Sequence, residues 1–366
     1  MNDAADERDE GDERSDTAEA GRHELLDPNA TSPEVVDEAD DRVGLRPRSL
    51  AEFVGQADLK ARLAVILGAA SKRNQPPDHM LFAGPPGLGK TTLAHIVANE
   101  IGAELHITSG PALERPGDLA SILANLQHGD VLFIDEIHRL SRTVEEVLYP
   151  AMEDFHVDLV IGKGPAAKTL RMKLESFTLV GATTRTGLIT GPLRDRFGLT
   201  ERLDFYEPAD LETIVIRAAR ILDVVVDDEG ADEIARRSRG TPRIANRLLR
   251  QVRDYSEMHA DGRIDADVAR LGLAFFGVDE LGLDRPTRAV LERLCLSFGG
   301  GPVGLSTLAT STSEPQETVE DVYEPFLIQQ GLLIRTPRGR VAMPAAWKHL
   351  GLAPPLTEER PVSLFE

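Results

Sequence analysis

Apolar residues in the first half of the chain recur in short runs that are separated by stretches of helical period. The runs HMLFA (79–83), ELHITS (104–109), DVLFIDE (130–136) and FTLVGATT (177–184) are typical of buried strands. Helices are expected over 91–102, 116–127 and 142–155, and an extended start at residue 46 leads into a further helix. Alternation of this kind predicts an α/β fold, a parallel sheet with helices on both faces.

The alternation is interrupted between Phe155 and Phe177. There the segment VDLVIGKGPAAKTLRMKL (157–174) has two arms of alternating apolar and polar residues around Gly162 and Pro165. This pattern predicts a β-hairpin that projects from the sheet. Strand alternation would turn about half of its apolar side chains outward and the other half onto the protein's own core. The apolar positions are Val157, Leu159, Ile161, Leu170, Met172 and Leu174.

Beyond Tyr206 the pattern becomes helical and then changes again. Four helices are expected over 209–222, 228–240, 241–262 and 265–277, and together they describe a small helical domain. Three more are expected over 285–298, 304–312 and 315–330. The stretch that follows, GLLIRTPRGRVAM, alternates around Pro337 and Gly339 like two short strands and a turn. Three helices followed by a hairpin describe a winged helix.

The net charge of −20 is unevenly distributed along the 366 residues. Residues 1–42 contain sixteen acids and four arginines, a net charge of −12, which leaves −8 for the other 324 residues. This tail is rich in charge and poor in large apolar residues, so we expect it to be disordered. For the remainder, overall acidity is weak evidence against nucleic-acid binding, because binding depends on where the arginines lie.

The sequence offers little that would direct the chain to secretion or to a membrane. The N-terminus has neither the basic start nor the apolar stretch of a secretory signal, and the longest apolar runs are too short to cross a bilayer. The one cysteine, Cys295, cannot form an internal disulfide and lies in a helical pattern, as a small core residue does. We therefore expect a cytoplasmic protein without a membrane partner.

The segment GPPGLGKTT (84–92) fits the phosphate-binding loop of nucleotide hydrolases. Its glycines allow backbone N–H groups to close around phosphate oxygens, and the N-terminus of the following helix adds a favourable dipole. Lys90 would reach the β- and γ-phosphates, and the Thr91 hydroxyl would bind Mg²⁺. The alternative, an ordinary glycine-rich turn, is disfavoured because the segment follows a strand and opens a helix.

Two acids follow the strand run VLFI. Asp135 and Glu136 come at its carboxyl end, the end of a parallel sheet where ligands bind. Asp135 can hold the Mg²⁺ shell, and Glu136 can orient and polarise the attacking water. A pair of surface acids is the alternative, and the phosphate loop upstream argues against it. These residues predict ATP hydrolysis with Mg²⁺.

Two arginine-bearing segments, GPLRDRFG (191–198) and GTPRIANR (240–247), lie outside this core. With GPPGLGKTT, FIDEIHRL and LVGATTRTGLI, in this order, they resemble the AAA+ ATPases. With RPRSLAEFVGQ in front and EDVYEPFLIQQGLLIRTPRGR behind, the chain more narrowly resembles the RuvB family, the bacterial Holliday-junction branch-migration motors. The resemblance covers about residues 43–350, and the acidic tail departs from it.

The resemblance implies a role for each matching residue. Lys90, Asp135, Glu136, Thr183 as sensor (or its neighbour Thr184) and Arg196 as a finger inserted into a neighbouring subunit's site would be catalytic. Thr91 and Asp135 would hold the metal. The nucleotide would contact Leu45, Arg46, Gly87, Gly89, Lys90, Thr91, Thr92, Glu153, Asp154, Phe155, Arg196, Tyr206 and the second sensor Arg243, and DNA would contact Arg335 and Arg340.

The resemblance also implies an architecture and partners. Together with the charge and helix patterns above, it divides the chain into an acidic tail (1–42), a large AAA+ domain (43–205), a helical lid (206–276), a winged helix (277–350) and a C-terminal tail (351–366). The family works as hexameric rings on double-stranded DNA at four-way junctions. RuvA holds the junction, with the hairpin at about 156–174 as its docking surface, and RuvC cuts it.

The charges of the winged helix indicate which of its elements can contact DNA. Its third helix has five acids between Glu314 and Glu324 and no Lys or Arg, so phosphates would repel it and guanine edges would find no partner. The wing segment RTPRGR (335–340) instead offers arginines to the DNA backbone, and backbone contacts carry no base sequence. A grip independent of sequence suits a motor. A solvated basic turn is the alternative reading.

Three other classes of protein are alternatives to the motor. A clamp-loader type of replication or repair ATPase shares the sheet, finger and sensors, but it ends in a helical collar and not a wing. A sequence-specific regulator would need a reading helix, and the acidic third helix argues against one. A protein-remodelling AAA+ machine would be expected to carry an aromatic pore loop, and the sequence offers no convincing one.

Overall fold

The computed structural model describes residues 44–161 and 168–354. It divides the chain into the units Met1–Arg46 and Pro47–Glu366, and all elements below belong to the second. The tail predicted to be disordered and the hairpin turn around Gly162 and Pro165 lie outside the described residues.

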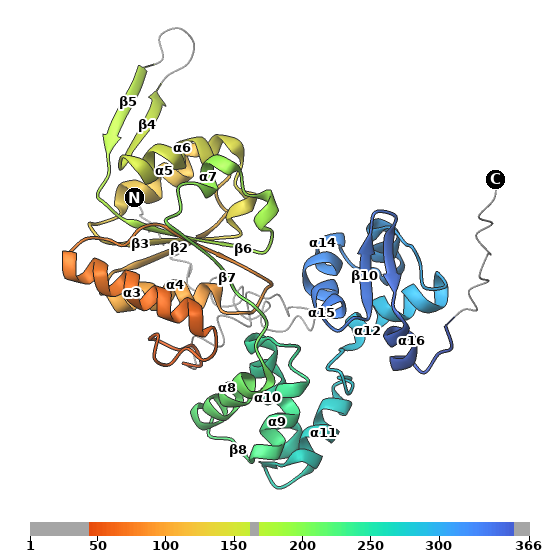
Figure 1. Ribbon diagram of the computed structural model, residues 1–366. Coiled ribbons are helices and arrows are strands. Elements are labelled where there is room, and N and C mark those ends of the chain that lie inside the picture. The colour runs from red at the N-terminus through yellow and green to blue at the C-terminus, as the bar shows by residue number, and fades with distance from the viewer. Residues whose placement is uncertain (1–43, 162–167, 355–366) are drawn as a thin grey trace, which may run out of the picture. The chain divides into compact units, whose positions relative to one another are not determined.

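A five-stranded parallel sheet forms the first part of the second unit, in the order β2-β3-β6-β1-β7 (Figure 1). Its strands are β1 (Met80–Ala83), β2 (Leu105–Ser109), β3 (Val131–Asp135), β6 (Thr178–Thr183) and β7 (Leu199–Arg202). Every residue of β1 and β6 is buried, which explains why neither strand contains a charged residue. The sequence did not predict strand β7, because three of the four residues in its segment LTER are polar, as they can be in an edge strand.

Helices cover both faces of this sheet, as the alternation predicts. Helices α3 and α4 lie on one face and α5, α6 and α7 on the other (Figure 1). Their bounds are α3 Ala57–Arg73, α4 Lys90–Ile101, α5 Pro116–Asn125, α6 Arg142–Glu153 and α7 Gly191–Arg194, with single 3₁₀ turns at Ile137–Arg139 and Thr186–Leu188. Alternation along β3 divides its side chains between the two faces, with Leu132 and Ile134 packing against α5 and α6.

The predicted hairpin is present as antiparallel strands β4 (His156–Ile161) and β5 (Lys168–Lys173), which project from the sheet (Figure 1). Two of its apolar residues do not face outward, because Val157 and Leu174 are buried in the core beside α6. Met172 packs partly against the same core, whereas Leu170 is 52% exposed. The side chains of Leu159 and Ile161 lie outside the described set.

Four helices follow, as expected, with one small addition. They are α8 (Pro208–Ile221), α9 (Asp228–Arg236), α10 (Pro242–His259) and α11 (Ala266–Phe275). Proline begins α8 and α10, where its missing N–H costs nothing. The addition is a parallel pair of two-residue strands, β8 (Val225–Val226) and β9 (Arg263–Ile264), too short for a pattern to predict.

The last part is the predicted winged helix around its own core. Its helices are α12 (Arg285–Glu292), α13 (Leu305–Thr312), α14 (Gln316–Thr318), α15 (Glu324–Gln329) and α16 (Pro344–His349), and its wing is β10 (Leu333–Thr336) paired with β11 (Gly339–Ala342). The third helix is interrupted by a π-helical turn at Val319–Tyr323 that joins α14 to α15. Cys295 is a buried core residue, and burial raises the pKa of its thiol to about 11.

Candidate nucleotide and DNA sites

The phosphate loop joins β1 to α4 and is shaped by glycine. Gly87 and Gly89 have φ values of 79° and 102°, which glycine adopts without strain. A side chain at Gly87 would also lie 2.7 Å from Thr241 and 3.0 Å from Arg243. Lys90, the first residue of α4, is 7% exposed, and its Nζ donates to the carbonyls of Gly84 (2.8 Å) and Pro85 (2.9 Å). The ammonium group is thus held inside the loop.

The two acids stand where the sequence predicts, at the carboxyl end of β3. Asp135 is the last residue of the strand, and its Oδ1 accepts from the backbone N–H of Glu136 at 2.9 Å. Glu136 has a φ of 46°, a left-handed conformation that is strained for a residue with a side chain. Gly110 makes room for this bend, since a Cβ there would lie 2.4 Å from the Glu136 carbonyl oxygen.

The pKa values of the two acids are shifted in opposite directions. Burial raises the pKa of Asp135 against the opposing pull of Lys90. Burial also opposes ionisation of Glu136, but hydrogen bonding by His138 and the charge of Lys90 outweigh it and lower the pKa of that carboxyl. Glu136 is therefore held as a carboxylate, the form that can accept a proton from water.

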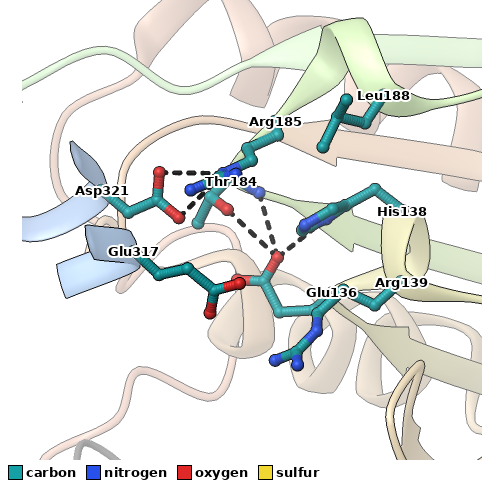
Figure 2. A pocket seen from close by; sticks show the side chains of 8 residues that line it. All are labelled: Glu136, His138, Arg139, Thr184, Arg185, Leu188, Glu317 and Asp321. Carbon is teal, nitrogen blue, oxygen red and sulfur yellow. Dashed lines mark hydrogen bonds and ion pairs between the residues drawn. The ribbon is translucent and has the colours of Figure 1, made fainter. Parts of the chain in front are cut away.

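The carboxylate of Glu136 is fixed by two neighbours (Figure 2). His138 Nδ1 lies 3.0 Å from its Oε2, and Thr184 donates to the same oxygen from its hydroxyl at 3.2 Å and its backbone N–H at 3.3 Å. Thr183 is fully buried, and its hydroxyl lies 3.0 Å from His138 Nδ1. Sequence reasoning gave His138 no role, although it stands two residues after Glu136 on the same turn.

A polar cavity of about 260 Å³ opens beside Glu136. It is lined by Glu136, His138, Arg139, Thr184, Arg185, Leu188, Glu317 and Asp321 (Figure 2). Arg185 Nε donates to both carboxylate oxygens of Asp321 at 3.0 Å, and its Nη2 lies 3.0 Å from Glu320. Two of the acids counted on the third helix are thus paired with an arginine.

The residues predicted to close on the nucleotide from the lid side meet the loop. Arg243 lies in the first turn of α10, and its backbone N–H donates to Gly87 O at 3.4 Å. The Tyr206 hydroxyl donates to Leu88 O at 3.1 Å, and burial raises the pKa of this phenol. Phe53, which sequence reasoning missed, packs under the loop so closely that a Cβ at Gly89 would lie 3.2 Å from its ring.

Four other predicted site residues lie near the amino ends of the parallel strands, opposite the carboxyl ends that carry the phosphate loop. Glu153 ends α6, and Asp154 and Phe155 follow it. They lie next to His79, which directly precedes β1 and whose Nε2 lies 3.0 Å from the Met152 carbonyl oxygen. Arg196 precedes β7, and its Nη2 lies 3.1 Å from Glu153 Oε1. Lys90 follows the carboxyl end of β1. These four residues are therefore not brought together with the phosphate loop of their own chain.

The remaining predicted nucleotide contacts are less informative. Thr91 and Thr92 follow Lys90 in the first turn of α4 and are half-buried. Leu45 is buried and Arg46 half-buried, and both belong to the N-terminal unit. The Thr91 hydroxyl and the Asp135 carboxylate are hard oxygen donors of the kind Mg²⁺ prefers, and a bound cation would keep the buried Asp135 ionised. The donor set therefore fits Mg²⁺ with a nucleotide.

The wing arginines face each other across the hairpin, where Arg335 pairs with Arg340 in the antiparallel register. Both are bonded to Glu324, at 2.6 Å from Arg335 Nε to Oε2 and 2.6 Å from Arg340 Nε to Oε1. The Arg335 side chain is 42% exposed and that of Arg340 is 14% exposed. One buried acid therefore holds both arginines, a pairing that the sequence did not predict.

Comparison with known proteins accounts for these features together. Residues 45–203 match the Holliday junction DNA helicase RuvB P-loop domain, 206–279 the RuvB AAA lid domain and 280–351 the RuvB C-terminal winged helix domain. The chain belongs to the RuvB family. Its predicted fold class, an AAA+ sheet followed by a helical lid and a winged helix, is confirmed.

RuvB proteins of known sequence and structure are similar over most of the chain. The Holliday junction branch migration complex subunit RuvB of Acidothermus cellulolyticus is 61% identical over 331 residues, which cover 90% of this chain and 89% of that protein. The subunit of the same name from Mycolicibacterium smegmatis is 57% identical over 343 residues, 94% of this chain and 98% of that one. The solved Thermotoga maritima RuvB Holliday junction branch migration motor has a TM-score of 0.79 at 48% identity, covering 84% of this chain and 99% of that chain.

Proposed function

We propose that the chain is the ATP-driven motor subunit that moves Holliday junctions during recombination and DNA repair, in the cytoplasm with the DNA. The observation that carries this proposal is the Glu136 carboxylate, fixed beside Thr184 and His138 at the end of β3, in a chain that also ends in a winged helix. A clamp-loader ATPase shares the first feature, whereas the winged helix favours the motor. The direct test is whether the chain, with RuvA and ATP, dissociates a synthetic four-way junction.

In this proposal each group at the carboxyl end of the sheet has one task. Lys90 and the N–H groups of the loop bind the phosphates, and Thr91 and Asp135 hold Mg²⁺, which neutralises charge that develops on the phosphates. Glu136 orients and polarises the attacking water. Its lowered pKa keeps it ionised at neutral pH.

We infer that Thr184, and not Thr183, is the polar sensor next to the γ-phosphate. Its hydroxyl donates a hydrogen bond to the carboxylate of Glu136. It is therefore released when that carboxylate rotates to bind the attacking water. The Thr183 hydroxyl is fully buried against His138 and is better suited to hold the imidazole. Arg243, whose helix α10 begins at the loop, is the proposed second sensor that couples the phosphates to the lid.

The position of four predicted site residues at the amino ends of the strands supports a ring in which each nucleotide site is shared between two subunits. Arg196 and the residues Glu153, Asp154 and Phe155 lie beyond the amino ends of the strands, at least one strand length, about 10 Å, from the phosphate loop. They can therefore contact nucleotide only in a neighbouring subunit. An arginine finger supplied in trans is worth several powers of ten in phosphoryl transfer. We propose a hexameric ring.

The other partners follow from the proposed activity. Arg335 and Arg340 would contact the phosphates of double-stranded DNA, RuvA would dock on the hairpin β4–β5, and RuvC would act on the same junction. The exposed side chain of Leu170 on β5 supports the docking surface. We also propose the domain division 43–205, 206–276 and 277–350, which the family matches at 45–203, 206–279 and 280–351 support.

A further inference from the structure

The acidic third helix and the basic wing meet at one buried carboxylate. Glu324, the first residue of α15, is 0% exposed, and its two oxygens each accept one Nε–H from the wing at 2.6 Å. Arg340 adds a second bond from its Nη2 to Oε2 at 3.2 Å. A buried carboxylate without a partner would be costly, so this acid and the two arginines depend on one another.

The backbone around the pair is also fixed. Arg340 exchanges two backbone hydrogen bonds with Val303, at 2.7 and 2.9 Å, in addition to its pairing with β10. Gly301 and Gly339 allow this close approach, since a Cβ on either would lie 2.3 Å from a backbone oxygen of Arg340 or Val303. With the backbone held, only the side-chain torsions of the two arginines remain to be set.

Two arginines side by side on a hairpin repel each other, and each loses rotamer entropy when it is ordered. Glu324 offsets both effects, because it neutralises one charge and fixes both guanidinium planes by their Nε edges. The Nη groups lie at the outer ends of these planes. On Arg335 they contact Glu320, where Nη2 donates to the carbonyl oxygen at 2.9 Å and Nη1 lies 3.7 Å from Oε1. On Arg340, Nη2 lies 3.6 Å from the same Oε1.

We infer that Glu324 is the positioning residue of the DNA grip: it holds the Nε–H groups of Arg335 and Arg340 and the Nη2 of Arg340, orders both side chains in advance, and leaves the Nη groups of Arg335 and the Nη1 of Arg340 for DNA phosphates. This inference rests on the DNA contacts in the proposed function. DNA competes with the peripheral acid Glu320 for the guanidinium ends, and the bonds to Glu324 persist in the complex. The more exposed Arg335 makes the stronger phosphate contact.

The inference predicts a change in DNA affinity opposite to the one expected from net charge alone. Removing an acid near DNA reduces repulsion and should tighten binding. Glu324→Gln should instead weaken duplex binding by about tenfold, because an amide accepts through one oxygen only and its NH₂ group opposes the Nε–H donor of one arginine. Glu317→Gln is the matched control. It removes one charge from the same acidic segment at an exposed position and should leave affinity unchanged or tighten it slightly.

The test is duplex affinity of the full-length chain for wild type, Glu324→Gln and Glu317→Gln, repeated in an Arg335→Ala/Arg340→Ala background. In that background we expect Glu324→Gln to cause no further weakening. An equal weakening there would show a merely structural role and overturn the inference, as would tighter binding by Glu324→Gln alone. If the double alanine variant binds DNA like wild type, the DNA grip itself is wrong and this inference falls with it.

A second measurement does not depend on whether Glu324→Gln folds. In ¹⁵N-labelled wild type, the Nε–H signals of Arg335 and Arg340, assigned by their loss in the single alanine variants, should exchange slowly with water. We expect them to stay protected when duplex DNA is added, while the Nη signals shift. Loss of Nε–H protection on DNA binding would mean that the arginines leave Glu324 for phosphate, and would overturn the inference.

Discussion

Arg196 and Glu153 are bonded to each other at the amino edge of the sheet, with Nη2 and Oε1 3.1 Å apart. The guanidinium also lies over the ring of Tyr149, 4.6 Å from its centroid, and its Nη1 donates to the Pro192 carbonyl oxygen. A side chain so placed cannot reach the phosphate loop of its own chain. In the proposed ring, a neighbouring subunit would meet it there.

The first prediction is that Arg196 acts in trans. Arg196→Ala and Glu136→Gln should each be inactive alone, and a mixture should recover part of the ATPase activity. Mixed rings contain some interfaces with an intact Glu136 and an intact neighbouring finger. ATPase rate against mixing ratio is the measurement, with mixed assembly confirmed by differently tagged chains. Mixed rings without any recovery would place the action of Arg196 within its own subunit.

The second prediction separates binding from hydrolysis at the carboxyl end of the sheet. Lys90→Ala should lose nucleotide affinity, because the buried ammonium is the charge inside the loop. Glu136→Gln should bind ATP within a few-fold of wild type but hydrolyse it at least about 100-fold more slowly, because an amide cannot accept a proton from water. Nucleotide titration and single-turnover hydrolysis measure the two effects. Equal losses of affinity in both variants would contradict the assignment.

Local patterns predicted most of the fold, and they pointed to the phosphate loop and the two acids as the candidate site. The loop, the two acids and the wing hairpin are each encoded within one short segment, so the sequence predicts them directly. Pairings between segments are not encoded in this way. Glu324 lies 11 residues from Arg335 and 16 from Arg340, and whether a helix acid turns inward to meet a wing arginine depends on packing. The same limit hid the contact of His138 with Glu136.

The third prediction concerns the hairpin β4–β5 as the docking surface for RuvA. Leu170 is exposed on β5, whereas Val157 on the paired strand is buried in the core. Leu170→Glu should abolish the stimulation by RuvA while thermal stability and basal ATPase stay at wild-type values. Val157→Glu, the control, should destabilise the protein because it buries a charge. RuvA stimulation that survives Leu170→Glu would reject this docking surface.

The fourth prediction concerns Asp284, the N-cap of α12. Its Oδ2 accepts from Arg239 at 2.7 Å and its Oδ1 from the Thr287 hydroxyl at 2.6 Å. Burial opposes ionisation, but Arg239 and Thr287 outweigh it and lower the pKa of this carboxyl. Asp284→Asn should reduce stability by about 3 kcal/mol at neutral pH, because it leaves Arg239 buried without a counter-ion.

The stabilisation by Asp284 should depend on pH in one direction. A folded pKa below the unfolded value of about 3.9 gives stability that is complete above the unfolded pKa and lost as the pH falls through the folded one. Melting curves of wild type and Asp284→Asn should therefore differ by a constant amount from pH 7 to about 5 and converge below about 4. A difference that grows with acidification would contradict the ionised pair.

The measurement that tests the central claim most directly is dissociation of a synthetic four-way junction by the chain with RuvA, ATP and Mg²⁺. Wild type should dissociate the junction and consume ATP as it does so, and Glu136→Gln should bind the junction yet dissociate it at least about 100-fold more slowly. Dissociation by Glu136→Gln at the wild-type rate would contradict an ATP-driven motor. So would a wild-type chain that hydrolyses ATP in the presence of RuvA and leaves the junction intact.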